Sequence, residues 1–429
     1  MLKDKIDHKK ARICVMGMGY VGLPLAVAFA DKGYFVYGFD TSESRISKLN
    51  RGENYIVDVS SRHVLKLIKD GRFLPTIEAK ALRDSDVVIV CVPTPLRKVK
   101  IPDISYVVNA ARTVKKYLKK GQLIILESTS YPTTTSEVVL PILKQTGLVP
   151  EKDFYLCFSP ERVNPGDKDF PVTRIPKLVG GTSYESGSLA LRLYSQIIAR
   201  VTQVSSAEVA ETAKLLENTF RMVNIALANE FSIVCHKLGI SIWEVIAAAA
   251  TKPFGFMPFY PGPGVGGHCL PCDPIYLSWK ARKMGFKTRM IDLASSVNHY
   301  MPRYVVERVG ELLSSRGNGL KGSRVLIMGV TYKKDVLDLR ESPAIDIIEN
   351  FKAAGTRVDY YDPLAEYLKV GSIDIKRSPI SVSAIKKYDC LVIVTDHSGV
   401  DYEFLRKHSR LVFDTRNVYK KSYANVRSL

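Results

Sequence analysis

The sequence predicts an α/β protein in which two doubly wound parallel sheets are joined by a central helical region with one long helix. Short apolar strands alternate with helical stretches from residue 12 to about residue 203. A helical apolar period then continues for more than thirty residues, and the strand and helix alternation returns from about residue 306. Near-continuous apolar strands of this kind are typical of parallel sheets covered on both faces.

The first repeat of this alternation is the clearest. "RICVMG" (12–17) is a short apolar strand, "YVGLPLAVAFADKG" (20–33) is a helix with small and apolar residues on one face, and "FVYGFD" (35–40) is the next strand. The first domain is expected to cover residues 1–203. Its further strands are expected at 86–93, 122–129 and 154–160, and its further helices at 105–120 and 134–147.

Residues 204–305 form the predicted central helical domain. The stretch 205–239 keeps a helical period, begins with a Ser-x-x-Glu capping box at Ser205 and Glu208, and stops at Gly239. A helix of this length measures about 50 Å, more than one small domain needs. We therefore expect it to join two domains and to offer a dimerisation face, so that the protein forms a homodimer or a higher homo-oligomer.

Residues 306–429 form the second, smaller doubly wound domain. Its first turn, "GVTYKKD", lacks a three-glycine pattern, so this domain is expected to bind a different ligand from the first. Its strands are expected at 323–330, 357–363, 389–396 and 410–416, and its first helix at 342–355.

Composition excludes several classes of protein. Hydrophobic residues make up 46% and charged residues 24% of the 429 residues, which is ordinary for globular proteins. No stretch of about 18 uninterrupted apolar residues occurs, so no membrane insertion is expected. The N-terminus begins with charged residues and lacks the apolar segment of a secretory signal. We expect a cytoplasmic protein whose cysteines are reduced.

The formal net charge of +19 favours anionic partners. The basic residues are spread along the chain in short clusters such as "KKYLKK", without the interleaved aromatic residues of a nucleic-acid stacking surface. Anionic small molecules are therefore expected as ligands, and nucleic acid is not.

A glycine-rich turn between the first strand and helix predicts dinucleotide binding. Gly17, Gly19 and Gly22 form G-x-G-x-x-G, and Asp40 ends the next strand 18 residues after Gly22. The glycines allow a pyrophosphate to approach a helix N-terminus, and the carboxylate accepts hydrogen bonds from ribose hydroxyls and repels a 2′-phosphate. NAD is therefore favoured over NADP. Arg45, one turn into the next helix, is a candidate for covering the adenine.

The stretch "GGHCLPCD" (266–273) places two cysteines three residues apart. A redox dithiol normally occurs at a helix start in a thioredoxin-like domain, and a zinc ribbon needs a second such pair. The surrounding glycine- and proline-rich sequence predicts a loop instead. Cys269 is then a single nucleophile, Gly266 and Gly267 leave room for a substrate, and exposed amides stabilise an anion. A structural loop cysteine is the alternative.

A reactive cysteine beside NAD indicates chemistry at the aldehyde level. A thiolate adds to an aldehyde to give a hemithioacetal, which loses hydride to NAD and becomes a thioester. Hydrolysis of the thioester releases an acid.

Several motifs together resemble the UDP-sugar 6-dehydrogenases, which include the UDP-glucose, UDP-N-acetylglucosamine and UDP-N-acetylmannosamine enzymes. These motifs are "GMGYVGLPLA", "CVPTPL", "EST", "SPERV", "AKLLENTFR", "PGPGVGGHCLPCDP" and "GVTYKKDVLDLRESPA", in order from about residue 12 to about 418. The resemblance implies oxidation of the sugar C6 hydroxyl to a carboxylate in two NAD-dependent steps, for polysaccharide or glycan precursor synthesis, in a dimeric or larger assembly.

The resemblance also implies catalytic roles. Cys269 matches the family nucleophile, and Lys214 and Asn218 match its polar partners, four residues apart on one face of the long helix. Glu161 in "SPER" matches the carboxylate that assists thioester hydrolysis through water. Asp273 matches the acid that orients the same network.

Further positions match the family's ligand contacts. Thr129 matches a family position that contacts the cofactor and also the substrate, so it is expected among the catalytic residues as well. The positions that match cofactor contacts are Gly17, Gly19, Tyr20, Val21, Gly22, Asp40, Arg45, Thr94, Thr129 and Arg340. Those that match UDP-sugar contacts are Glu161, Arg162, Val163, Lys214, Asn218, Arg221, Gly266, Tyr332, Lys333 and Arg416. No metal is expected.

Departures from the family pattern bear on mechanism and substrate. Pro165 stands where some members have a second Glu, which puts a two-carboxylate mechanism in doubt, and Cys272 is expected to be a bystander. "ATKPFGFMPFYPGPGVGGHC" is more similar to the N-acetylglucosamine branch than to the N-acetylmannosamine branch, and His268 also argues for an acetamido sugar over glucose. UDP-N-acetylmannosamine and UDP-glucose remain alternatives. A 6-phosphogluconate- or hydroxyacid-type dehydrogenase and a non-catalytic NAD-binding regulator are the alternative classes.

Overall fold

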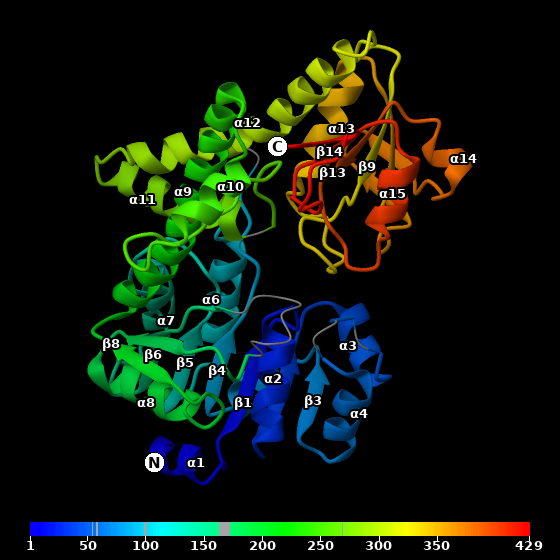
Figure 1. Cartoon of the computed structure of the whole chain (residues 1–429). Coiled ribbons are helices and arrows are strands. Elements are labelled where there is room, and N and C mark those ends of the chain that lie inside the picture. The colour runs from blue at the N-terminus through cyan, green and yellow to red at the C-terminus, as the bar shows by residue number, and fades with distance from the viewer. Residues whose placement is uncertain (54, 57–58, 98–100, 163–171, 268) are drawn as a thin grey trace. The chain divides into compact units, whose positions relative to one another are not determined.

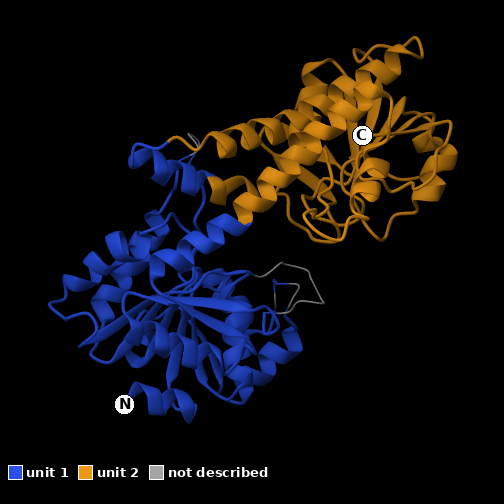
Figure 2. Ribbon diagram, turned by 60° about the vertical axis from the view of Figure 1, so that its left-hand side comes forward, with its two compact units in different colours: residues 1–217, 275–286 blue, residues 218–274, 287–429 orange. Residues whose placement is uncertain are grey.

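The computed structural model describes residues 1–429 except 54, 57–58, 98–100, 163–171 and 268 (Figure 1). The chain divides into two compact units (Figure 2). Unit 1 comprises residues 1–217 and 275–286, and unit 2 comprises residues 218–274 and 287–429. The chain passes from unit 1 to unit 2 between residues 217 and 218 and returns between residues 274 and 275. Both points lie inside helices, so the predicted central helical region is divided between the two units. The division into three domains stays a prediction.

Unit 1 is built on an eight-stranded sheet in the order β3-β2-β1-β4-β5-β6-β7-β8. All neighbouring strands are parallel except β6 and β7, which are antiparallel. The strands are β1 (Arg12–Met16), β2 (Phe35–Phe39), β3 (Phe73–Thr76), β4 (Val87–Val90), β5 (Gln122–Leu126), β6 (Phe154–Phe158), β7 (Lys177–Gly181) and β8 (Val201–Val204).

Helices cover both faces of this sheet, because alternate residues of its strands are buried on opposite sides. Ile13 and Val15 of β1 belong to one apolar cluster, whereas Cys14 and Met16 belong to another. This confirms the expectation from the apolar strands. The helices of unit 1 before the long helix are α1 (Leu2–Asp7), α2 (Gly22–Asp31), α3 (Glu43–Asn50), α4 (Ser61–Lys69), α5 (Lys80–Asp84), α6 (Ser105–Tyr117), the π-helix η1 (Thr135–Val139), α7 (Leu140–Lys144) and α8 (Tyr184–Tyr194).

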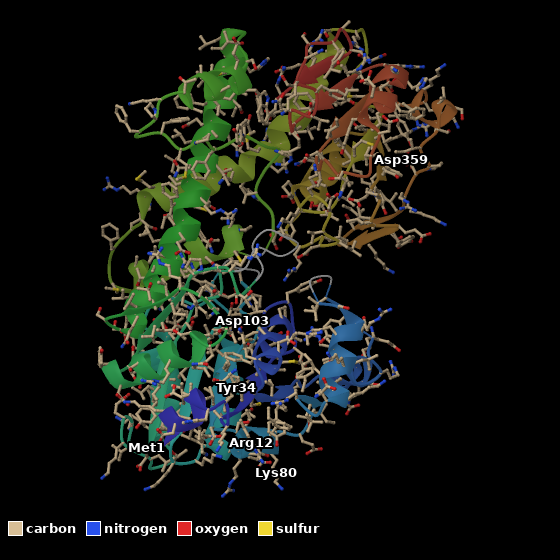
Figure 3. All side chains as sticks on the ribbon, turned by 60° about the horizontal axis from the view of Figure 1, so that its bottom comes forward. Met1, Arg12, Tyr34, Lys80, Asp103 and Asp359 are labelled. Carbon is tan, nitrogen blue, oxygen red and sulfur yellow. The ribbon has the colours of Figure 1, made fainter. Side chains whose placement is uncertain are left out.

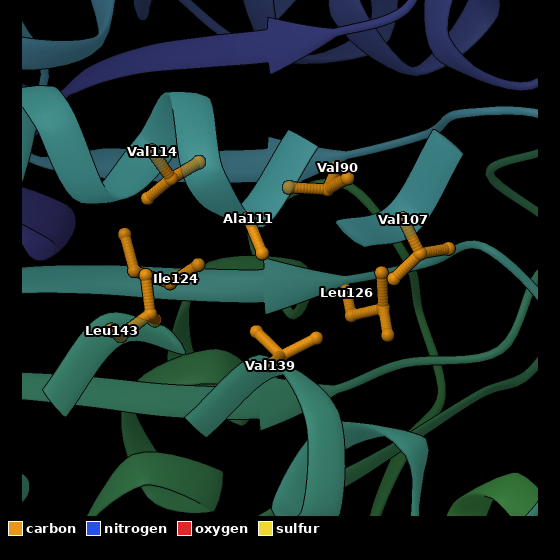
Figure 4. A pocket seen from close by; sticks show the side chains of 8 residues that line it. All are labelled: Val90, Val107, Ala111, Val114, Ile124, Leu126, Val139 and Leu143. Atoms are coloured by element: carbon orange, nitrogen blue, oxygen red, sulfur yellow. The ribbon is translucent and has the colours of Figure 1, made fainter. Parts of the chain in front are cut away.

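Two details describe the packing of this unit. The hydroxyl of buried Tyr34 donates to the carbonyl of Ile6 in α1 at 2.7 Å, which ties the N-terminal helix to the domain (Figure 3). A small void between the sheet and the helices α6, η1 and α7 has only apolar lining, so it is a packing defect and not a ligand site (Figure 4). Its lining residues are Val90, Val107, Ala111, Val114, Ile124, Leu126, Val139 and Leu143.

The central region contains the long helix that the sequence predicts. Helix α9 (Ala207–Leu238) has 32 residues and ends before Gly239, whose φ of +70° lies in the left-handed region that glycine favours. Its N-terminal cap differs from the prediction, since the Ser206 hydroxyl, and not that of Ser205, accepts from the Val209 amide. The helix starts one residue later than expected, which displaces the cap by one position. The other helices here are α10 (Ile242–Ala249), α11 (Cys269–Lys283) and α12 (Arg289–Ser314).

Unit 2 contains a second parallel sheet, in the order β10-β9-β13-β14-β15. Its strands are β9 (Arg324–Met328), β10 (Arg357–Tyr361), β13 (Cys390–Ile393), β14 (Val412–Asp414) and β15 (Val426–Ser428). A short antiparallel hairpin, β11 (Tyr367–Val370) and β12 (Ile373–Lys376), forms a separate two-stranded sheet. The helices are α13 (Pro343–Ala353), α14 (Val382–Ile385) and α15 (Tyr402–His408).

The predicted fold class, with two doubly wound sheets and a central helical region, is thus confirmed. No helix among the described residues combines the length and the apolar character that a bilayer span requires.

Candidate active site

The glycine turn after β1 lies at the point in unit 1 where the strand order reverses, between β1 and β4. Gly17 has a φ of +101°, and a Cβ there would lie 2.3 Å from the Cys91 carbonyl oxygen. A Cβ at Gly22 would lie 1.9 Å from the Gly17 carbonyl oxygen. Both glycines are therefore required by close packing of the turn against its surroundings.

Gly19 differs from its two neighbours in the motif. A Cβ at Gly19 would meet no atom within 4 Å, so the protein alone does not require glycine at this position. This open space lies next to the N-terminus of α2, where a dinucleotide fold receives the pyrophosphate. The turn therefore fits a dinucleotide.

Asp40 follows β2 and is buried, with 5% of its surface exposed. Its Oδ2 accepts from the Met18 amide at 2.8 Å and from the Arg45 guanidinium at 3.2 Å. Its Oδ1 accepts from the Ser42 amide at 2.8 Å. The carboxylate is thus held by the glycine turn and by α3, with Arg45 half-exposed beside it. These contacts leave acceptor capacity for a ribose, since an ionised carboxylate has about four acceptor sites.

The remaining predicted cofactor residues of unit 1 lie at or after carboxyl ends of strands. Thr94 follows β4 and is buried, and its carbonyl accepts from the Tyr276 hydroxyl. Thr129 follows β5 and is half-buried. Tyr20, in the glycine turn, is 40% exposed. Ligands of open parallel sheets bind at this edge, so the arrangement supports the predicted cofactor site.

Glu161 follows β6 in the same unit and lies beside a buried ion pair that the sequence analysis did not include. The Lys177 ammonium is 3.0 Å from Glu127 Oε1 and 4.0 Å from Glu161 Oε2. The Arg162 amide donates to Glu161 Oε1 at 2.6 Å. Burial raises the pKa of Glu127, against the lowering effect of Lys177. The glutamate predicted to assist hydrolysis therefore lies in a mostly buried, charged environment.

Arg162, predicted to contact the UDP-sugar, is engaged within unit 1. Its guanidinium donates to both oxygens of Glu217 in α9, at 3.2 Å and 2.5 Å, and to the Pro176 carbonyl at 2.8 Å. Lys214, one turn earlier in α9, is buried, with 7% of its surface exposed. Val163 lies outside the described residues, as do His268 and Pro165.

The position of Cys269 corrects the expectation of a loop. Cys269 is the first residue of α11, and its side chain is exposed, whereas Cys272 is buried. The sequence "GGHCLPCDPIY" conceals this helix because Pro271 and Pro274 suggest a break. Pro271 lies in the first helical turn, where proline is tolerated, and Pro274 lies inside the helix. A helix N-terminus favours negative charge, so the location suits a thiolate.

Asp273 and Asn218 lie together in unit 2. Both are buried, and the Asn218 side-chain amide donates to Asp273 Oδ2 at 2.5 Å. Asp273 follows Cys269 by four residues in α11, which places the two on one face of the helix. The structure thus joins Asn218, a predicted polar partner of the nucleophile, to Asp273, the predicted orienting acid.

The space that a side chain at Gly266 or Gly267 would occupy is filled by other parts of unit 2. A Cβ at Gly266 would lie 2.6 Å from the Glu341 carbonyl oxygen, and one at Gly267 would lie 2.7 Å from the ring of Tyr332. The Gly267 amide donates to the Arg340 carbonyl at 3.1 Å, so it is not a free anion donor. These glycines instead allow the turn after β9 to pack against the segment before Cys269. Burial raises the pKa of Tyr332 above its ordinary value.

The turn that carries Tyr332 and Lys333 is held by a buried histidine. The His397 Nε2 lies 3.0 Å from Asp362 Oδ2, and the Asp335 amide donates to Nδ1 at 3.0 Å. Because Nδ1 accepts a hydrogen bond, Nε2 carries the proton and donates to the carboxylate. His397 and four backbone amides hold Asp362, whose pKa is lowered to about 2 although burial opposes the shift.

The other predicted ligand residues of unit 2 differ in burial and contacts. Arg416 donates from Nε to the Val394 carbonyl at 2.7 Å, and burial lowers its pKa. A Cβ at Gly262 would lie 2.8 Å from the Arg416 guanidinium, so a side chain there would displace the guanidinium. Arg340 is exposed and forms an ion pair with Asp338, Arg221 is exposed, and Lys333 is half-buried. Within the described ranges, no group of three or more His, Cys, Asp or Glu side chains could hold a metal ion.

Comparison with known protein families shows which family the chain belongs to. Three models of the UDP-glucose/GDP-mannose dehydrogenase family match the chain: the NAD binding domain at residues 11–198, the central domain at 208–300 and the UDP binding domain at 326–421. The chain belongs to the UDP-glucose/GDP-mannose dehydrogenase family. It is an NAD-dependent oxidoreductase and a UDP-sugar dehydrogenase, which confirms the predicted resemblance, enzyme class and cofactor.

Individual relatives match most of the length of the chain. A UDP-N-acetyl-D-glucosamine 6-dehydrogenase of Pseudomonas aeruginosa is 38% identical over 91% of this chain and 91% of its own. A UDP-N-acetyl-D-mannosamine dehydrogenase of Pyrococcus horikoshii is 35% identical over 96% of both chains. A solved structure of a UDP-D-ManNAc dehydrogenase from P. horikoshii superposes with a TM-score of 0.89 at 34% identity, covering 97% of this chain and 98% of that one.

These relatives set aside the two alternative classes, a hydroxyacid-type dehydrogenase and a non-catalytic regulator. Sequence reasoning missed Glu127, Lys177 and Tyr194, since a glutamate and a lysine fifty residues apart carry no spacing signal of an ion pair. The one available signal was a lysine as the first residue of an otherwise apolar stretch, "KLVGG".

Proposed function

We propose that this enzyme oxidises the C6 hydroxyl of UDP-N-acetylglucosamine to the uronic acid in two NAD-dependent steps, through a covalent intermediate on Cys269. The observation that supports this most directly is the exposed Cys269 at the start of α11, with the Asn218–Asp273 hydrogen bond one turn away. The product would serve as a precursor for polysaccharide or glycan synthesis.

The glycine turn, Asp40 and Arg45 would hold NAD, which accepts the hydrides when bound. Cys269 Sγ adds to the C6 aldehyde, and Lys214 and Asn218 stabilise the negative charge that develops on the C6 oxygen. Glu161 takes a proton from the water that attacks the thioester, and Asp273 orients Asn218 through their hydrogen bond. Tyr332, Lys333, Arg221 and Arg416 bind the UDP-sugar, with cationic side chains suited to the diphosphate.

The choice of sugar is supported by sequence. Relatives named for N-acetylglucosamine are 38% and 35% identical, and relatives named for N-acetylmannosamine are 32% to 36% identical. The segment before Cys269, "ATKPFGFMPFYPGPGVGG", favours the N-acetylglucosamine enzymes. UDP-N-acetylmannosamine is the second candidate, because several relatives carry that name.

A substrate panel tests the proposal. Purified enzyme is given NAD and either UDP-glucose, UDP-N-acetylglucosamine or UDP-N-acetylmannosamine, and NADH and sugar are both quantified. We expect the highest kcat/KM with UDP-N-acetylglucosamine and about two NADH formed per sugar consumed, as a four-electron oxidation requires. A higher kcat/KM for another sugar would reject the substrate, and one NADH per sugar with released aldehyde would reject the two-step mechanism.

We also propose that helix α9 forms a dimer interface with a second copy of the chain. Its C-terminal half exposes Leu227, Phe231, Val234 and Leu238, each between 47% and 67% exposed. The spacings of four, three and four residues place all of them on one face of the helix. Such an apolar stripe is unusual on a monomer.

Charged substitutions in this stripe are expected to separate the copies. The Leu227→Glu/Phe231→Glu variant should sediment with half the mass of the wild type, because two carboxylates cannot be buried unpaired in an apolar interface. Analytical ultracentrifugation measures this, with Lys237→Glu on the same helix as a matched charge control. A wild-type enzyme that sediments as a monomer, or an unchanged mass in the double variant, would reject this interface.

A further inference from the structure

Lys177 is a buried lysine that no step of the proposed mechanism uses. It is the first residue of β7, and only 5% of its side chain is exposed. Taking an ammonium out of water costs several kcal/mol unless partners compensate. Burial alone would lower the pKa of Lys177, but Glu127 and Glu161 raise it overall, so the side chain stays charged.

The contacts of the ammonium connect the ends of three strands. Its Nζ lies 3.0 Å from Glu127 Oε1, just after β5, and donates to the Pro160 carbonyl at 3.4 Å, just after β6. It lies 4.0 Å from Glu161 Oε2 and 4.9 Å from the centre of the Tyr194 ring in α8. The Tyr194 hydroxyl donates to the same oxygen of Glu127.

This arrangement holds more negative charge than a structural ion pair needs. One ammonium faces two carboxylates, of which Glu127 is fully buried and Glu161 is 13% exposed. Glu127 alone would neutralise the lysine. The ammonium also contacts Pro160 and Glu161, in the segment that carries the proposed hydrolytic carboxylate.

We propose that Lys177 is a positioning residue for thioester hydrolysis, which fixes the Glu161 carboxylate. This inference rests on the proposed function. In that step the water oxygen bonds to the thioester carbon, the carbon–sulfur bond breaks with its electron pair on Cys269 Sγ, and the water proton passes to Glu161. The carboxylate must face the attacking water to take this proton, and the ammonium 4.0 Å from Glu161 Oε2 attracts the carboxylate and limits its movement.

The neighbouring groups around the Lys177 ammonium are neutral or paired. Burial raises the pKa of the Cys91 thiol, after β4, and of the Tyr194 hydroxyl, so both stay protonated. The Arg162 guanidinium forms an ion pair with Glu217.

Three variants separate positioning from folding. Lys177→Met removes the ammonium that lies between two carboxylates. Glu127→Gln/Lys177→Met removes one carboxylate as well, which relieves the buried charge but still removes the ammonium beside Glu161. Glu127→Gln alone keeps Lys177 beside Glu161 and serves as the matched control.

The readouts are the melting temperature, the rates of the two NADH-forming phases, the rate of acid formation and the mass of the protein during turnover. In Lys177→Met and in the double variant we expect acid formation to fall about 10- to 100-fold. We also expect a sugar adduct to accumulate on the protein. The KM values for UDP-sugar and NAD should stay unchanged. The double variant should melt close to the wild type, and Glu127→Gln should keep the wild-type rate of acid formation.

Two outcomes overturn the inference in different ways. A double variant with the wild-type rate of acid formation and no accumulated sugar adduct would show that Lys177 is only a structural ion-pair partner, while the proposed function stands. A wild-type enzyme that forms no acid from any UDP-sugar would reject the proposed function and the role of Lys177 together. If Lys177→Met does not fold, the double variant and Glu127→Gln decide the question.

Discussion

Replacing Cys269 with serine is expected to lower the rate of uronic acid formation by at least about 10³-fold, because Cys269 is the nucleophile that the second oxidation requires in the proposed mechanism. A serine hydroxyl is a far weaker nucleophile than a thiolate at neutral pH. The variant should still bind NAD and UDP-sugar, since Cys269 is exposed at the start of α11 and supports no core. Steady-state NADH formation and titration of both ligands measure the two properties.

The matched control is the cysteine one helical turn later. Cys272 is buried and is placed outside the reaction, so Cys272→Ala should keep the NADH stoichiometry and lose at most some stability. The account is contradicted if Cys269→Ser forms acid at the wild-type rate, or if only the Cys272 variant stops doing so.

The glycine turn gives the second large effect, in which two neighbouring glycines respond differently to alanine. Gly17→Ala should destabilise unit 1 by about 2–4 kcal/mol, because the new Cβ would lie 2.3 Å from the Cys91 carbonyl at a φ of +101°. Gly19→Ala should leave the melting temperature of the free enzyme unchanged, since its Cβ meets no atom within 4 Å. Thermal unfolding without ligand measures both variants.

Gly19→Ala should nevertheless weaken NAD binding by about tenfold or more, because the Cβ would occupy the space where the pyrophosphate approaches the backbone. Isothermal titration with NAD measures this loss separately from folding. Wild-type affinity in Gly19→Ala would mean that the open space beside α2 is not the pyrophosphate site.

Sequence pattern predicted the fold because local signals and long-range packing agree in the two sheets. The alternation at residues 12–40 needs no partner to be recognised, and β1, α2 and β2 form there. The end of α9 could also be predicted, since Gly239 adopts the left-handed conformation that favours glycine. Adjacent serines at its start were ambiguous, because Ser205 and Ser206 offer the same capping hydroxyl.

The candidate site was predicted less completely, for physical reasons. The glycines before Cys269 suggested free space, but Tyr332 and Glu341, some seventy residues away in the chain, occupy the space beside them. Such a requirement arises from tertiary packing and leaves no local signal. The same holds for Lys177, whose partners come from other strand ends.

The most direct test of the account is the identity of the atom that carries the oxidised sugar. A Glu161→Gln variant, in which hydrolysis is slowed, is mixed with NAD and UDP-N-acetylglucosamine, quenched in acid, and analysed by intact mass and peptide mapping. The account predicts one acyl adduct per chain, on the peptide that contains Cys269 and on the sulfur of that residue. Continued acid formation with no adduct, or an adduct on Cys272, would contradict it.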